Sequence, residues 1–199
     1  MALFKEIHCV HCGEKTGMMS RTKLTDGNYV CAKCTKKLPI MLKAELHKYN
    51  YAEFQKLCDY VQEMETVLRK QFHATYSFYG IHIDTEHGLF KVDDFDRAVI
   101  LKFENLSDFA LDYQPDEVKD GVFSTKVTGK LYYKMKMNFP YVFRDGILAE
   151  RVKSSAQIKE GLFKKKAIYS NPVGLDEFIY HFNQIWNQEV NAMYDPLTR

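Results

Sequence analysis

The sequence predicts an α+β protein in three parts: a small cysteine-rich N-terminal domain, a helical connector, and an antiparallel β domain closed by a C-terminal amphipathic helix. Three observations lead to this prediction. Two C-x2-C pairs lie near the start of the chain, apolar residues then recur at helical spacing, and short β-branched and aromatic runs separated by turn residues follow. We place the three parts at residues 1–38, 39–73 and 74–199.

Composition limits the classes of function. A chain of 199 residues that is 46% hydrophobic can bury a substantial core. The formal net charge of +2 gives no global attraction to nucleic acid or to an anionic membrane. The sequence contains no stretch of eighteen apolar residues and does not begin like a signal peptide, so we expect no transmembrane segment and a cytoplasmic location. In a reducing compartment, clustered cysteines indicate metal binding or redox chemistry.

The four N-terminal cysteines have the spacing of a zinc site. Cys9 and Cys12 form one pair, Cys31 and Cys34 form the other, and eighteen residues separate the pairs. Two residues between thiols let one tight turn present both sulfurs to one ion, and two such turns complete a tetrahedron. Asp26-Gly27 predicts a hairpin that carries the chain from one pair to the other. We therefore expect one structural Zn²⁺, bound by the four cysteines of a zinc ribbon.

Other uses of these cysteines fit less well. A thioredoxin-like pair needs one C-x-x-C beside a βαβ pattern, and a zinc deaminase needs an H-x-E element that the sequence lacks. Four thiolates also close the coordination shell that a catalytic zinc keeps open. His8 and His11 are alternative ligands, although we interpret them as surface residues beside the turn.

A family resemblance supports the zinc site. The run CVHCGEKTGMMSRTKLTDGNYVCAKCTKKL combines the C-x2-C-G turn, an apolar pair before a basic residue, Asp26-Gly27 and a closing C-x2-C. It resembles the small bacterial zinc-ribbon family known as domain of unknown function 4428, over roughly residues 7 to 40. The resemblance implies a metal and a fold, and it implies no reaction.

The connector is predicted to be helical. Asn50 and Glu53 have the spacing of a capping box, and the spacing of later apolar residues predicts a helix over about residues 51–72, after a shorter one over 40–48. Cys58 lies on the apolar stripe, so we interpret it as a core residue. Such a regular stripe needs a partner surface.

From about residue 75 the apolar residues no longer recur at helical spacing and instead alternate with polar residues. The predicted strands cover residues 75–83, 88–92, 98–103, 109–113, 122–127, 131–139, 147–152 and 162–169. A single helix follows, with Leu175, Phe178, Phe182, Trp186 and Met193 on its apolar stripe. Short strands followed by one such helix resemble the pleckstrin-homology-like (PH-like) β-barrel, in which the helix plugs one end. Other small β-barrels and an α+β sheet remain alternatives.

The sequence shows no assembled catalytic motif. It lacks G-x-S-x-G, a phosphate-binding glycine loop and H-E-x-x-H. The acidic group Asp93, Asp94 and Asp96 lacks the spacing of a calcium loop, so we interpret it as a polar turn. We therefore predict that the protein is not an enzyme. A hydrolase whose residues meet only in the fold is the third hypothesis, after the two binding functions described below.

Two groups of basic residues suggest binding surfaces. On the ribbon, the candidate residues for contacts to nucleic-acid phosphates are Arg21, Lys23, Lys33, Lys36 and Lys37. In the β domain, acidic lipids or peptides are the candidate ligands of Lys130, Lys134, Lys136 and the run Lys164-Lys165-Lys166. Lysines on an exposed sheet also prevent aggregation between strands, and we prefer that interpretation.

We therefore predict a non-enzymatic, zinc-binding module for protein–protein interaction. The abundance of Lys, Asn, Tyr and Phe is compatible with an AT-rich bacterial or phage genome, which suggests an adaptor or an inhibitor that binds and blocks an enzyme. A nucleic-acid-binding protein acting through the ribbon is the alternative. The sequence does not define the partner or the oligomeric state.

Overall fold

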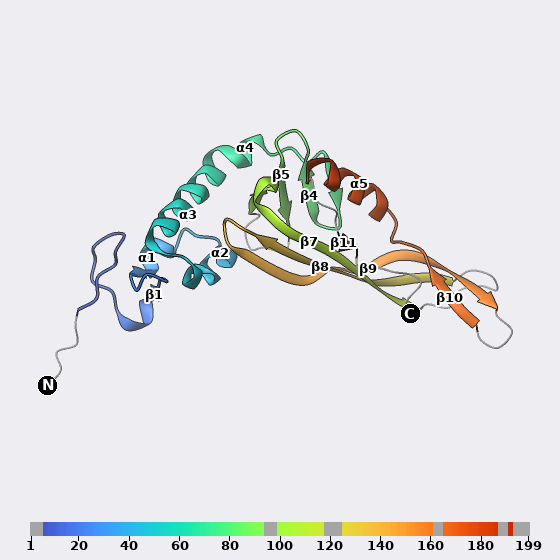
Figure 1. Ribbon diagram of the computed structural model, residues 1–199, viewed down its shortest axis with the longest axis horizontal. Helices are drawn as coiled ribbons and strands as arrows, with labels where there is room; N and C mark the ends of the chain where they lie inside the picture. The colour runs from blue at the N-terminus through green and yellow to red at the C-terminus, as the bar shows by residue number, and fades with distance from the viewer. Residues whose placement is uncertain (1–5, 94–98, 118–124, 161–164, 187–190, 193–199) are drawn as a thin grey trace.

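The structure is a computed structural model, and it describes residues 6–93, 99–117, 125–160, 165–186 and 191–192. The molecule is elongated, with the cysteine-rich domain at one end and the paired strands β9 (Val142–Glu160) and β10 (Lys165–Tyr169) at the other (Figure 1). The connector and the β domain lie between these ends, so the two cysteine pairs are far from the outer end of the β domain.

The N-terminal domain is a small hairpin followed by short helices. Its elements are η1 (Met18–Ser20), β1 (Arg21–Lys23), β2 (Tyr29–Cys31) and α1 (Ala32–Thr35). Strands β1 and β2 are antiparallel, with Arg21 opposite Cys31. Gly27 has a φ of +82°, and Asp26 accepts a 3.1 Å hydrogen bond from the N–H of Asn28. The predicted hairpin is therefore confirmed, although its loop has three residues, Thr25, Asp26 and Gly27, between Leu24 and Asn28 rather than the two of a tight Asp-Gly turn.

The connector is helical over the predicted range. It comprises α2 (Ile40–Ala44), η2 (Leu46–Lys48), α3 (Tyr51–Glu63), a π-helical turn η3 (Met64–Leu68) and α4 (Arg69–Gln71). The Asn50 side chain accepts from the N–H of Glu53 at 2.9 Å, and the Asn50 N–H donates to the Glu53 carboxylate at 2.8 Å. This capping box confirms the predicted start of the long helix.

The connector contacts both the cysteine-rich domain and the β domain. Phe54 and Leu57 are fully buried in a core that continues into the cysteine-rich domain. Further along α3, the Tyr60 hydroxyl donates to the carbonyl of Ile100 at 2.7 Å. At the β8–β9 turn, the Tyr141 N–H donates to the Tyr49 hydroxyl at 2.6 Å. The partner surface that the stripe required is therefore supplied by the chain itself.

The β domain contains two sheets. The first has the order β3 (Tyr76–Phe78), β4 (Ile81–Asp84), β5 (Leu89–Val92) and β6 (Ile100–Lys102). A short turn η4 (Phe103–Asn105) leads to the second sheet. Its strands are β7 (Leu106–Glu117), β8 (Thr125–Met137), β9 (Val142–Glu160), β10 (Lys165–Tyr169) and β11 (Asn191–Ala192), in the order β10-β9-β8-β7-β11. Strand β11 is parallel to β7, and the other pairs are antiparallel.

The expected β-barrel is not confirmed. The described strands form two open sheets, and the turn η4 leads the chain from the edge strand β6 into β7 without a ladder between them. Among the described residues, aromatic side chains of the C-terminal helix contact both sheets. Closure depends on pairing between strands that are distant in sequence, which alternation within each strand does not specify.

Several predicted strands have different bounds. The run over residues 75–83 is a hairpin, because Tyr79 and Gly80 both have positive φ and form the two-residue turn between β3 and β4. Strands β7 and β9 extend well beyond the predicted runs 109–113 and 147–152, and β8 joins the predicted runs 122–127 and 131–139 into one strand. Parts of the predicted runs 98–103, 122–127 and 162–169 lie outside the described residues, as do Asp94, Asp96, Lys164 and Met193.

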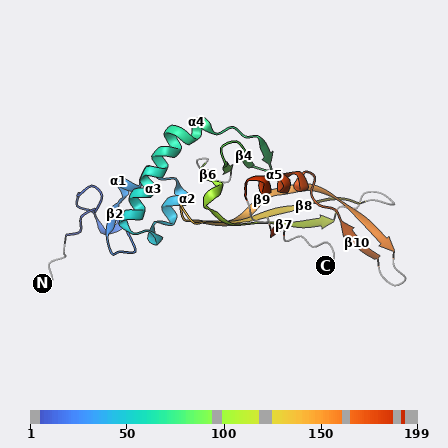
Figure 2. The same cartoon turned by 45° about the horizontal axis from the view of Figure 1, so that its top comes forward.

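Helix α5 (Leu175–Ile185) fills the space between the two sheets. Phe178 stacks on Phe78 of β3 with ring centroids 4.8 Å apart, and Phe182 stacks on Phe109 of β7 at 4.5 Å. Figure 2 shows α5 and the four-stranded sheet on the same side of the five-stranded sheet. In the described parts of the chain, no helix has the length and apolar character needed to cross a membrane.

Candidate metal centre

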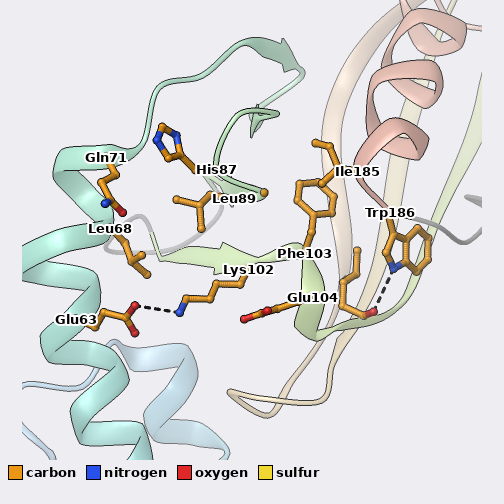
Figure 3. Close-up of a pocket in the computed structure, with 12 residues that line it drawn as sticks. Glu63, Leu68, Gln71, His87, Leu89, Lys102, Phe103, Glu104, Ile185 and Trp186 are labelled. Carbon is orange, nitrogen blue, oxygen red and sulfur yellow. Dashed lines mark hydrogen bonds and ion pairs between the residues drawn. The ribbon is translucent and has the colours of Figure 1, made fainter.

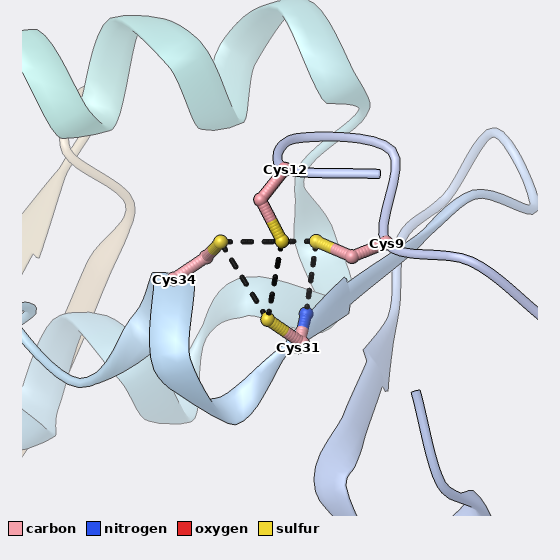
Figure 4. A group of neighbouring side chains, drawn as sticks. All are labelled: Cys9, Cys12, Cys31 and Cys34. Carbon is pink, nitrogen blue, oxygen red and sulfur yellow. Dashed lines mark hydrogen bonds between the residues drawn. The ribbon is translucent and has the colours of Figure 1, made fainter. Parts of the chain in front are cut away.

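The structure brings the four N-terminal cysteines together. The sulfurs of Cys9, Cys12, Cys31 and Cys34 all lie within 4.8 Å of one another and face a common centre (Figure 4). Cys9 and Cys31 are buried, Cys34 is partly buried and Cys12 is exposed, so the cluster lies at the surface of the domain. These four sulfurs can hold a metal ion.

Local backbone geometry positions each pair. After the first pair, Gly13 has a φ of +74° and donates its N–H to the carbonyl of Cys9 at 2.8 Å. This tight turn requires a positive φ, which glycine adopts readily. The second pair begins at the end of β2 and continues into the single helical turn α1, so Cys31 and Cys34 lie on one side of that turn. The two pairs thus use different local structures to reach one centre.

The distances between sulfurs fit a tetrahedral metal site. They are 3.8 Å for Cys9–Cys34, 3.7 Å for Cys12–Cys31 and 3.6 Å for Cys31–Cys34. A tetrahedron with metal–sulfur bonds of about 2.3 Å, the usual Zn–S length, has edges of about 3.8 Å. These three of the six sulfur–sulfur distances therefore match the edges of a zinc–thiolate tetrahedron, and all four sulfurs lie within 4.8 Å of one another.

The electrostatics of the cluster favour a bound cation. Burial acts to raise the pKa of Cys9, but N–H groups of Cys12, Cys31 and His11 lower the pKa to about 7. Burial and the neighbouring thiols raise the pKa of Cys34. For Cys12, the N–H of Glu14 acts to lower the pKa, but burial and the thiols of Cys9 and Cys31 outweigh it and raise the pKa. Four negative sulfurs repel one another unless a cation lies between them, and a metal ion deprotonates its thiol ligands.

The two nearby histidines have other roles. The Nδ1 atom of His8 lies 3.0 Å from the carbonyl oxygen of Gly13. The His11 ring packs edge-on against Phe54 of α3, with centroids 5.4 Å apart. Among the described residues, the group that can hold a metal ion contains only the four cysteines. The His11–Phe54 contact instead joins the first cysteine turn to the long helix.

The five basic residues proposed for nucleic-acid binding differ in their environments. The guanidinium of Arg21 lies over the Tyr29 ring, 4.7 Å from its centroid. The Lys33 ammonium forms a 2.6 Å ion pair with Glu14. The other three, Lys23, Lys36 and Lys37, are exposed. Two of the five cations therefore already have intramolecular partners.

The lysines of β8 do not form a purely basic patch. Asp145 lies opposite Lys134 in the β8–β9 ladder, and Asp108 lies opposite Lys136 in the β7–β8 ladder. A shallow cleft of about 370 Å³ lies over β7, β8 and β9 beside Lys134. Positive and negative side chains alternate across this face, which weakens the case for acidic lipids.

Sequence reasoning missed a hydrogen-bonded chain in the four-stranded sheet. The Ser77 hydroxyl lies 2.8 Å from His82 Nδ1, and His82 Nε2 lies 2.8 Å from the Asp93 carboxylate. The hydrogen bond from His82 holds the pKa of Asp93 below its usual value. Correct placement of the Tyr79-Gly80 turn would have predicted the Ser77–His82 pair. The order of groups is that of nucleophilic catalysis, but neither described cleft is lined by these residues.

Comparisons with known proteins identify part of the chain. Residues 8–57 match the family model described as "Domain of unknown function (DUF4428)". The match covers about a quarter of the chain, contains all four cysteines and continues into α3, beyond the boundary that we placed after Leu38. No curated protein and no solved structure matches the chain.

Proposed function

We propose that the protein is a non-enzymatic interaction module in which a structural zinc ion fixes a partner-binding surface. The observation that supports this proposal is an exposed methionine pair in the turn that leads into the hairpin of the cysteine-rich domain. Met18 is 71% exposed and Met19 is fully exposed, although both are large apolar side chains. Flexible, polarisable methionines at a surface suit the recognition of apolar groups on a partner.

The zinc ion would hold this methionine pair in a fixed position. Met18 and Met19 form the turn η1, which leads directly into β1 at Arg21. Arg21 lies opposite Cys31, one of the four sulfur ligands, so the metal would anchor the hairpin that carries the methionines. Rigid presentation lowers the entropy that binding must overcome. The target would be an enzyme that the module blocks or a complex that it joins as an adaptor.

The β domain supports a binding function as well. We propose a PH-like relationship for residues 74–199 without the closed barrel, on the basis of two sheets, antiparallel except for the short strand β11, and an amphipathic helix near the C-terminal end. In such folds, sheet edges and grooves contact peptides. The alternative of nucleic-acid binding through the ribbon is less well supported, because Arg21 and Lys33 already contact Tyr29 and Glu14.

A capture experiment tests the interaction proposal. The tagged chain is incubated with native lysate, half of it nuclease-treated, and any retained protein is identified, purified and measured in direct binding. We expect a stoichiometric protein to survive nuclease, and we expect Met18→Ser with Met19→Ser to weaken its binding at least about tenfold, which corresponds to about 1.4 kcal/mol. The matched control is Val173→Ser, because Val173 is 72% exposed but lies in the β domain.

Two outcomes would contradict the proposal. Equal binding by the double methionine variant would exclude this surface. Retention that vanishes with nuclease, and that falls when Lys36 and Lys37 are both changed to Glu, would instead assign the function to nucleic-acid binding.

A further inference from the structure

The largest described cleft lies where four distant segments of the chain meet. Its volume is about 680 Å³, within the range of small-molecule sites. Figure 3 shows it enclosed by the connector helix, the β4–β5 turn, the start of β7 and the end of α5. No part of the cysteine cluster or of the methionine pair lines this cleft. A ligand here would therefore be independent of the interaction surface proposed above.

One part of the cleft is lined by apolar side chains, and the rest is lined by polar ones. Leu68, Leu89, Phe103, Leu106 and Trp186 line it, and each is less than about a tenth exposed. Side chains that line a cleft while remaining almost inaccessible form a firm wall, since they are also packed against the core. The cleft thus has a preformed apolar surface that can contact the apolar part of a small ligand.

The charged groups lie along one side of the cleft. Lys102 Nζ and Glu63 Oε1 form an ion pair at 3.0 Å, so the lysine charge is already neutralised. Figure 3 places the Glu104 carboxylate on the same side of the cleft as this ion pair. His87 directs Nδ1 to the buried carboxylate of Asp84 at 2.9 Å. Because Glu63 and Lys102 neutralise each other, the excess negative charge of the lining lies at Glu104.

From this combination we propose that the cleft binds an organic cation with an apolar body, of the arylalkylamine class. The apolar part would contact Leu89, Phe103 and Trp186, and the ammonium would donate to the carboxylates of Glu104 and Glu63. An anionic ligand of the same shape would meet the carboxylates of Glu104 and Glu63, and the one lysine of the lining, Lys102, is already neutralised by Glu63.

The chain contains its own reporter for this site. Trp186 is the only tryptophan in the sequence, and it lines the cleft. Its indole Nε1 donates to the carbonyl of Leu106 at 3.1 Å, so its orientation is fixed. Occupancy of the cleft would change the surroundings of this single fluorophore.

The test is a titration of the full chain with three probes of one shape: 4-phenylbutylamine, 4-phenylbutanol and 4-phenylbutyrate. Binding is measured by Trp186 fluorescence and confirmed by calorimetry. We expect the amine to bind at least about tenfold more tightly than the carboxylate, which corresponds to about 1.4 kcal/mol, with the alcohol between them.

Two variants with opposite expected effects sharpen the test. Glu104→Gln should weaken binding of the amine about tenfold and leave the alcohol unaffected, because it removes only the charge. Lys102→Gln should strengthen binding of the amine, because it frees the Glu63 carboxylate. Glu150→Gln is the matched control, since Glu150 is exposed on β9 away from the cleft. Equal affinity for all three probes, preference for the carboxylate, or no binding at all would overturn the proposal.

Discussion

The two ends of the molecule are stabilised in different ways. The cysteine-rich domain has a small hairpin, short helices and a cluster of four thiols, and its buried side chains join those of the connector. The β domain instead buries a large set of aromatic rings, among them Phe78, Phe103, Phe109, Phe178 and Phe182. Units of about 40 residues rarely bury enough apolar surface to fold alone, and metals commonly compensate. One end therefore depends on the chemistry of four side chains, and the other depends on packing.

Removal of the metal should have the largest effect, because it should unfold the cysteine-rich domain and leave the β domain folded. Cys9→Ser combined with Cys12→Ser should abolish zinc binding and unfold the hairpin, because structural zinc sites contribute about 10–16 kcal/mol of binding free energy. Metal analysis should fall from about one zinc per chain to none. Hydrogen exchange should lose protection in β1 and β2 while β7, β8 and α5 stay protected.

The fifth cysteine supplies the control. Cys58 lies partly buried on α3 outside the cluster, and burial raises the pKa of its thiol. Cys58→Ser should therefore keep the full zinc content. Complete zinc occupancy in the double variant would refute the assignment of the ligands.

A second, smaller effect is expected at low pH, where the β domain should lose the stabilisation that ionised Asp84 provides. Asp84 is fully buried, and its carboxylate accepts from the N–H groups of His73, Glu86 and His87. Burial acts to raise the pKa of Asp84, but these N–H donors and the His87 ring outweigh burial, so the pKa is lowered. Because the pKa is lowered in the folded state, ionised Asp84 stabilises the fold at pH values above its pKa in the unfolded chain, about 3.9. That contribution should be lost as the pH falls below this value toward the folded pKa.

The measurement is urea unfolding followed by Trp186 fluorescence at pH 7 and near pH 3. Asp84→Ala should destabilise the β domain by about 1–3 kcal/mol at pH 7, because three N–H donors lose their acceptor. The difference between the variant and the unchanged chain should shrink at the lower pH. A constant difference would show that the charge of Asp84 does not contribute. Thiolate ligands also protonate in acid, so metal content must be followed in parallel.

The predictability of each part reflects how local its determinants are. The cysteine spacing, the Asp26-Gly27 turn and the Asn50–Glu53 capping box all act within a few residues, and the structure contains each of them. Strand pairing is different, because the ladder that extends β7, β8 and β9 depends on partners far along the chain. The prediction of a closed barrel was not confirmed for that reason. The Tyr79-Gly80 turn was missed because Tyr79 adopts a φ of +44°, which is uncommon for tyrosine.

The predicted sites follow the same rule. The spacing of the four cysteines in the sequence was sufficient to predict that their thiols lie together. The cleft around Trp186 does not, because residues 63–71, 87–89, 102–106 and 185–186 meet only after the connector, both sheets and α5 have packed. No periodicity in the sequence relates these segments. A site of this kind is therefore accessible only from the folded structure.

The smallest predicted effect concerns the contact between the two ends. The Tyr141 hydroxyl, at the β8–β9 turn, donates to the Glu53 carboxylate of α3 at 2.7 Å. Glu53 also accepts from the N–H of Asn50, and together these hydrogen bonds lower the pKa of Glu53. Tyr141→Phe removes one hydrogen bond but keeps the ring, which packs 4.7 Å from that of Tyr49. We expect a loss of about 1 kcal/mol in stability.

The location of that loss decides what the contact does. If Tyr141 couples the two ends, Tyr141→Phe should raise hydrogen exchange in α3 and in the cysteine-rich domain while zinc content stays unchanged. Tyr180→Phe is the matched control, because Tyr180 is 61% exposed on α5. Increased exchange confined to the β8–β9 turn would show instead that the two ends are stabilised independently, with the aromatic packing of Tyr49, Phe139 and Tyr141 as sufficient contact. The distinction matters for the proposed function, because among the described residues this contact and the rest of the connector link the domain that carries Met18 and Met19 to the β domain.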